Sequence, residues 1–357
     1  DWSVPSLAAM LRLQVQKGVG EINDETNTYG GIDITNNSWG FTCNFCDDFD
    51  SPLLSPLGDS LKYGVTDGRN GLGVNWVFAA GNSRTRGDNT NYHNFQNSRF
   101  VTTVAATDHQ GDTSYFSTPG ASILVSAFGE DVFTSSLYGW KPAAGTSFSA
   151  PIVSGVIGLM LEANPVLGYR DVQSILAYSA RQETSEGFKF NAASNWNGGG
   201  LHISHDQGFG LVDAHGAVRL AESWGKNSQT AENEQTIAIR RDSSGLIPDG
   251  PDQEGNATNL SFDVVVEREL DVEWAEVELD IRHKQISDLE VELVSPGGTV
   301  ARLIDHPYGG YGGVRDRIIF TTSASLFRGE SSVGNWTVRF TDTVTGEQGE
   351  VRQWGLK

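Results

Sequence analysis

One seven-residue segment constrains this chain more than any other. Residues 145–151 read Gly-Thr-Ser-Phe-Ser-Ala-Pro, and an almost wholly apolar run from Ile152 to Leu161 follows. The pattern predicts a buried helix that begins near Ser147. The hydroxyl and the amide N–H of Ser147 would then lie where the helix dipole favours a developing anion, as an acyl-transfer nucleophile requires. The alternative is an ordinary buried helix with a hydroxyl N-cap, because Ser and Thr are favoured caps for reasons unrelated to catalysis.

Length and charge limit the fold and the partners. The 357 residues exceed the size at which a single core usually stops growing, so we expect two domains. The net charge of -20 argues against nucleic acid or an anionic membrane as a partner. We expect no membrane span, because the chain has no uninterrupted apolar run long enough for one, and residues 1–20 lack the pattern of a signal peptide.

Cys43 and Cys46 form a Cys-x-x-Cys sequence. This spacing suits a redox pair, half of a zinc site or a small-loop disulfide. The chain has no second cysteine pair, so zinc would need His or acidic ligands from elsewhere. We expect a local disulfide or two free thiols.

The first part of the chain alternates strands and helices. We expect strands at Ile32 to Trp39, Val74 to Ala80, Phe100 to Ala106 and Ile123 to Ser126, and helices over residues 3–22, Ser55 to Gly64 and Arg170 to Ala180, with a last helix that Asp213 caps and that runs through Leu220. The continuous apolar run at residues 74–80 is typical of a strand buried in a parallel sheet. The prediction is an α/β fold with a parallel sheet and flanking helices.

The pattern changes after residue 224. A polar linker leads to a first edge strand at Thr236 to Ile239. Apolar residues then alternate strictly with polar ones, at residues 277–281, 289–293 and 336–340. Short alternating strands between Gly/Pro turns predict an all-β sandwich or jelly roll. We therefore divide the chain into domains at 1–224 and 225–357.

Residues 145–151 resemble the subtilisin-like serine proteases, whose nucleophile lies in Gly-Thr-Ser-x-Ala/Ser-Ala-Pro. Gly81-Asn82, directly after an expected strand, matches the place where that family has an oxyanion-binding Asn. The resemblance implies that Ser147 is the nucleophile and that the Asn82 amide binds the oxyanion, a donor whose loss typically costs about a hundred- to a thousandfold in turnover. The alternative for Asn82 is a left-handed turn after a strand, a conformation that Asn tolerates.

Residues 84–92 resemble the kexin and furin branch, the proprotein convertases. Residues 283–296 and 334–341 and the ending Trp354-Gly355-Leu356 resemble the P domain that follows the protease domain in that branch, so the resemblance covers nearly the whole chain. The chain departs from the pattern at His93, where the branch has an acid, and at Thr118, where it has a Glu. Strict cleavage after Lys or Arg is therefore not implied.

The resemblance also implies a substrate groove, a metal and a location. The implied substrate-binding residues are Ser38, Trp39, Gly40, Ala79, Ala80, Gly81 and Asp88. Structural calcium is implied without assigned ligands, and the acidic loop with Asp47, Asp48 and Asp50 is either a calcium site or a solvated surface. The implied enzyme is secreted or held in the cell envelope. Its partners are protein or peptide substrates and its own N-terminal segment or propeptide.

The base and its orienting acid are the missing parts. In the family they precede the nucleophile, in His-Gly-Thr and Asp-Ser/Thr/Asp-Gly, and neither sequence is present. We expect His215 to be a surface or packed residue, because it follows the nucleophile within a predicted helix. The prediction is an N-terminally incomplete serine endopeptidase whose Asp and His lie upstream, with little activity in this chain alone. The alternative is a catalytically inactive relative that serves as a peptide-binding or adhesion module.

Overall fold

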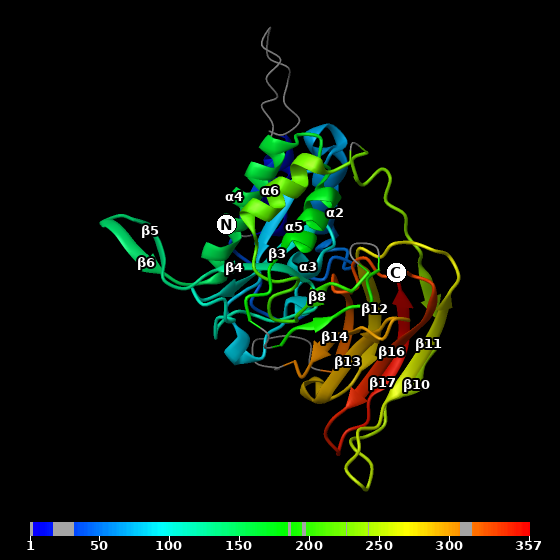
Figure 1. The fold of residues 1–357 in the computed structure, drawn as a ribbon. Helices are drawn as coiled ribbons and strands as arrows, with labels where there is room; N and C mark the ends of the chain where they lie inside the picture. Colours follow the sequence, from blue (N-terminus) through cyan, green and yellow to red (C-terminus); the bar gives the residue numbers. More distant parts are fainter. Residues whose placement is uncertain are drawn as a thin grey trace.

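The computed structural model describes residues 3–16, 32–184, 187–194, 198–225, 227–241, 243–307 and 316–357. A parallel sheet with helices forms the first part, and a β-sandwich forms the second (Figure 1). Both parts match the expected fold classes. The last six residues of the helix expected over 3–22 lie outside the described residues.

The parallel sheet has the strand order β1 (Ile34–Asn37), β2 (Asn75–Ala79), β3 (Val101–Thr107) and β4 (Ile123–Phe128). All three pairings are parallel. Every residue of β2 and β3 is buried, as expected for strands covered on both faces. The carboxyl ends of these strands therefore meet at one edge of the sheet.

Helices cover this sheet. They are α1 (Val4–Gln16), α2 (Ser55–Asp67), the short α3 (Asn94–Asn97), α4 (Thr146–Ala163), α5 (Tyr169–Ser179) and α6 (Ala214–Ser223). Four 3-10 turns lie at Gly68–Gly71, Arg84–Arg86, Thr90–Tyr92 and Ile286–Asp288, and the short strands β7 (Lys189–Phe190) and β8 (His202–Ile203) form a separate pair. As predicted, the side chain of Asp213 caps α6 and accepts a hydrogen bond from the Gly216 N–H at 2.9 Å.

α4 is the central helix of the first part. It contacts β1, β2, β3, β4 and α6, and Val153, Ile157 and Met160 on its buried face are fully enclosed. Within the described part of the chain, α4 is the one helix that length and composition alone would allow to cross a membrane. Its packing on the sheet accounts for that apolar character without a membrane.

A hairpin that the sequence did not predict precedes α4. β5 (Val132–Ser136) and β6 (Gly139–Ala143) pair with each other and extend away from the body of the molecule (Figure 1). Leu137 and Tyr138 at its tip are 95% and 99% exposed.

The sandwich consists of two antiparallel sheets. One has the order β10 (Gly245–Leu246), β17 (Glu350–Leu356), β12 (Ala275–Arg282) and β15 (Arg317–Ala324), with β9 (Ile239–Arg241) also on β17. The other has the order β11 (Leu260–Val266), β16 (Gly334–Asp342), β13 (Leu289–Val294) and β14 (Val300–Asp305). Burial alternates along β12 and β13, which confirms the predicted pattern. The first edge strand begins at Ile239, where the prediction had ended it.

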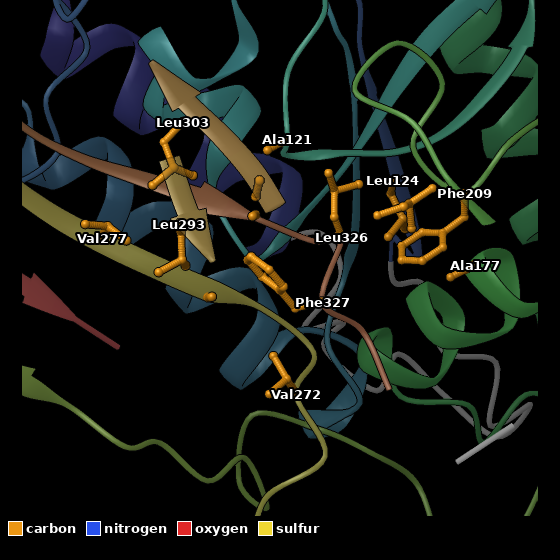
Figure 2. Close-up of a cluster of buried hydrophobic side chains, with 14 of the residues drawn as sticks. Ala121, Leu124, Ala177, Phe209, Val272, Val277, Leu293, Leu303, Leu326 and Phe327 are labelled. Atoms are coloured by element: carbon orange, nitrogen blue, oxygen red, sulfur yellow. The ribbon is translucent and has the colours of Figure 1, made fainter. Parts of the chain in front are cut away.

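One hydrophobic core continues from the first part into the second. Leu124 and Phe209 of the first part belong to the same buried cluster as Leu326 and Phe327 of the sandwich (Figure 2). Polar contacts accompany them: the Ser325 N–H donates to the Ala121 carbonyl at 3.0 Å. The two parts therefore share an interior.

Candidate active site

The turn that starts α4 presents Ser147. Gly145, at the N-cap, has a φ of 140°, a value that side chains rarely permit. The first N–H groups of a helix have no partner within the helix, and the N–H of Ser147 is among them. The positive end of the helix dipole lies at the same place.

Asn82 is fixed against this turn. Its side-chain carbonyl oxygen accepts hydrogen bonds from both the N–H and the hydroxyl of Thr146, each at 2.9 Å. The Asn82 amide nitrogen is therefore the end directed away from Thr146, and a Cβ on Gly145 would lie 3.4 Å from it. Asn82 is exposed, so this amide can donate to a ligand. Two N–H donors, one from Asn82 and one from Ser147, flank the turn at Gly145.

The predicted substrate segment at 38–40 reaches the same place. The Ser38 hydroxyl donates to the Ser147 carbonyl at 3.0 Å, and the Trp39 indole N–H donates to the Asn37 side chain at 3.1 Å. Gly40 packs closely on Gln96: a Cβ at Gly40 would lie only 2.7 Å from the Gln96 side-chain amide nitrogen. The same amide donates to the Ala79 carbonyl at 3.3 Å. Gln96 therefore contacts the segments that follow both β1 and β2.

The second predicted substrate segment follows β2. Ala79 and Ala80 are buried, whereas Gly81 is partly exposed and has a φ of 109°. The Gly81 N–H donates to the Thr146 hydroxyl at 3.2 Å, so Thr146 contacts both Gly81 and Asn82. Ser38, Gly40, Gly81, Asn82 and Ser147 thus come from three distant stretches of sequence and meet at the carboxyl ends of β1 and β2. Sequence reasoning missed Thr146 and Gln96, whose contacts complete the arrangement.

Asp88 lies beneath this edge. Its Oδ1 accepts from the His93 Nε2 at 2.8 Å and from the Asn89 N–H at 2.9 Å. Its Oδ2 would lie 3.9 Å from a Cβ on Gly81, and the Thr118 hydroxyl would lie 2.9 Å from the same position. Asp88 is therefore close to the predicted groove, with a side chain that is only 16% exposed.

No base faces the Ser147 hydroxyl among the described residues, which include all seven histidines. His93 contacts Asp88, His205 accepts from the Arg302 N–H, and His283 contacts Asp342. His215 is exposed on α6, in agreement with the expectation that it is a surface residue. The described residues thus bring together a hydroxyl and two N–H donors, without a histidine contact to that hydroxyl.

Two acidic groups among the described residues are candidates for the expected calcium, one in the sandwich and one in the loop with Asp47. The ligand atoms of Glu290, Asp305 and His306 lie within 4.8 Å of one another, but the Arg302 guanidinium is 3.4 Å from both carboxylates. In the acidic loop, Asp47 faces His93 at 3.7 Å. Because each group already contains a cationic or imidazole side chain, neither fits an all-oxygen calcium site.

Cys43 and Cys46 are joined by a disulfide, one of the two states that the sequence left open. The bond lies in the loop between β1 and α2.

The chain matches known protein families over most of its length. Residues 13–210 match the subtilase family, and residues 272–357 match the proprotein convertase P-domain. Kexin of Saccharomyces cerevisiae is 31% identical over 323 residues, which cover 84% of this chain and 37% of kexin. Proprotein convertase subtilisin/kexin type 6 of Rattus norvegicus is 30% identical over 350 residues, which cover 91% of this chain and 35% of the relative.

Solved structures share the fold. The serine protease of Aeromonas sobria, in a complex with a chaperone, superposes with a TM-score of 0.70 at 20% identity, over 93% of this chain and 72% of that one. The chain spans about a third of the length of the curated relatives that it matches. The matched regions follow each other in the same order as the two structural parts, and the chain therefore belongs to the subtilase family and carries a proprotein convertase P-domain.

Proposed function

We propose that the whole protein is a kexin-like serine endopeptidase in which Ser147 is the nucleophile. One observation carries the proposal: Thr146 holds the Asn82 side chain so that its amide is presented beside the turn that contains Ser147. An Asn that served only as a turn residue after β2 would not need both contacts. Family membership supports the same activity.

The chemistry follows from these positions. The Ser147 oxygen attacks the carbonyl carbon of a peptide, and the resulting oxyanion accepts hydrogen bonds from the Asn82 amide and the Ser147 N–H. The serine proton passes to a histidine, which returns it to the leaving amine, and water then hydrolyses the acyl-enzyme. We propose that this histidine and its Asp come from a segment of the whole protein outside this sequence. A serine hydroxyl without a base is weakly nucleophilic, so the present chain alone should have little activity.

We propose that an extended peptide lies along the two segments at the carboxyl ends of β1 and β2. Residues 38–40 and 79–81 would pair with the substrate backbone, as in other cases of strand addition. Asp88 would lie below the pocket for one substrate side chain. The Cys43–Cys46 disulfide supports a secreted or cell-envelope location, because disulfides persist in oxidising compartments. Calcium binding by the whole protein, and contact with its own N-terminal segment or propeptide, remain parts of the proposal without assigned residues.

A fluorophosphonate probe tests the proposal. The folded full-length protein should be labelled at Ser147, and mass spectrometry of its peptides should locate the adduct there. Ser147→Ala should abolish labelling, while Asn82→Ala should slow it by about a hundredfold. Ser149, a buried serine two residues along the same helix, is the internal control and should stay unlabelled.

Two outcomes would contradict the proposal. An adduct elsewhere that persists in Ser147→Ala would assign the nucleophile to another residue. A folded full-length protein that takes no label would favour the inactive peptide-binding or adhesion module.

A further inference from the structure

Three titratable side chains, two of them buried and one largely buried, lie together beneath the end of β2. Asp47 comes from the loop between β1 and α2, Asp88 from the loop after β2, and His93 from the residue that precedes α3. The side chain of Asp47 is 0% exposed and that of His93 is 3% exposed. Two segments that are separate in sequence, the loop with Asp47 and the stretch with Asp88 and His93, therefore place these charges side by side.

Each ring nitrogen of His93 faces a carboxylate. The Nε2 is 2.8 Å from Asp88 Oδ1, and the Nδ1 is 3.7 Å from Asp47 Oδ1. The Nδ1 and Asp47 Oδ1 have no hydrogen-bond partner among the described residues. The other oxygen of Asp47 accepts from the Phe95 N–H at 3.1 Å.

Only one protonation state suits both sides of the ring. A neutral imidazole has one N–H and one lone pair, so one of its nitrogens would present a lone pair to a buried carboxylate. Two buried carboxylates without a cation would also carry a large desolvation cost. The doubly protonated ring removes both problems, because it presents an N–H to the carboxylate on each side and carries a positive charge.

We propose that His93 is a built-in cation that binds the Asp47 and Asp88 carboxylates and joins the two loops at the floor of the groove in place of a divalent metal. The neighbouring groups agree with this assignment. Thr118 adds only a hydroxyl near Gly81, and that hydroxyl already accepts from the Ser83 N–H at 3.0 Å. Hard divalent cations prefer six or more oxygen ligands, and an imidazolium between the two acids excludes such a set.

The electrostatics favour the same state. Burial lowers the pKa of His93, but hydrogen bonding and charge attraction from Asp47 and Asp88 outweigh it and raise the pKa to about 10. The neighbouring titratable groups include Asp48, next to Asp47 in the loop, and Tyr92, whose pKa is raised mainly by its complete burial. Asp50 acts on Asp48, and Asp305 and Arg302 act on Tyr92. His93 is the cationic group that directly faces both Asp47 and Asp88.

Nuclear magnetic resonance of the chain labelled with 15N-histidine tests the protonation state. At pH 8 both ring nitrogens of His93 should carry protons. His205 is the internal comparison, because burial and the Arg302 charge lower its pKa to about 4 and it should carry one proton at the same pH. The variants His93→Asn and His205→Gln assign the signals by their loss. An unprotonated ring nitrogen on His93 at pH 8 would overturn the proposal.

Substitution of the cation gives an independent test. His93→Asp places three carboxylates together, so the Tm of this variant in EDTA should be lower than that of the wild type. Added calcium should raise the Tm of the variant by about 5 °C more than it raises the Tm of the wild type. His93→Asn has no charge at this position and should be destabilised in EDTA and in calcium alike. The proposal is wrong if His93→Asn is as stable as the wild type, or if folded His93→Asp responds to calcium no more than the wild type does. If His93→Asp does not fold, the ring protonation of the wild type decides.

The sign of the pH dependence follows from the raised pKa. A histidine whose pKa is higher in the folded state contributes its full stability below its ordinary value of about 6.5 and loses it as the pH rises toward 10. The Tm difference between the wild type and His93→Asn should therefore shrink between pH 6.5 and 10. A difference that grows over this range would contradict the charged ring.

Discussion

At the scale of single residues, Thr146 connects Asn82 to the turn that contains Ser147. Its hydroxyl donates to Asn82 and accepts from the Gly81 N–H, while its own N–H also donates to Asn82. A side-chain amide without such contacts would rotate, and its donors would point away from the oxyanion for part of the time. Thr146 is therefore a positioning residue for Asn82.

Thr146→Val tests this role, because valine has the same shape and no hydroxyl. The kcat of the full-length enzyme should fall by about tenfold, less than the loss of the donor itself, and KM should stay near that of the wild type. Thr146→Ser keeps the hydroxyl and is the matched control. A folded Thr146→Val enzyme with unchanged kcat would show that Asn82 is oriented by other contacts.

Sequence reasoning reached some of these residues and not others for a physical reason. Ser147 and Asn82 each lie in a short local pattern, so their roles could be proposed before the structure was known. The role of Thr146 depends on a contact with Asn82, 64 residues away. In the same way, the sequence shows His93 in place of an acid, but only the fold places Asp47 on the other side of its ring.

At the scale of elements, patterns succeed where one side of an element is buried. The alternation in β12 and the continuous apolar run of β2 both predicted strands that the structure contains. The hairpin of β5 and β6 carries no such signal, because Phe133 and Trp140 are 68% and 69% exposed. Periodicity records burial, so an element that extends into solvent leaves little trace of it.

The cap of α6 is an element whose energetic contribution can be measured. Asp213→Ala removes the acceptor for the Gly216 N–H and should lower the free energy of unfolding by about 1 kcal/mol. Asp213→Asn retains an acceptor oxygen and should lose only a few tenths of that amount. Denaturant titration of both variants measures the two values, and equal losses would mean that the cap hydrogen bond is not the stabilising interaction.

At the scale of the whole molecule, the two parts of the chain are not separate folding units, because they share one hydrophobic core. The sequence predicted a change of pattern near residue 225 but not that the two parts share a core. Phe209 and Phe327 belong to one buried cluster although more than a hundred residues separate them (Figure 2). The buried Arg328 guanidinium extends the connection, since it donates to Ser174 at 3.1 Å and to Gln173 at 3.3 Å on α5. We therefore expect the two parts to unfold together.

His205 makes this shared interior sensitive to acid. Its Nε2 accepts from the Arg302 N–H of β14 at 2.8 Å, a contact that only an unprotonated nitrogen can make. A histidine whose pKa is lowered to about 4 on folding contributes stability above about pH 6.5 and loses it as the pH falls toward 4. Because His205 is only partly buried, we expect its protonation to lower the free energy of unfolding by about 2 kcal/mol between pH 7 and 4.

His205→Gln tests this contribution, because glutamine offers an acceptor that does not titrate. Between pH 7 and 4 the free energy of unfolding of this variant should fall by about 2 kcal/mol less than that of the wild type. Parallel stability curves for the two proteins would show that acid weakens the molecule elsewhere than at this contact.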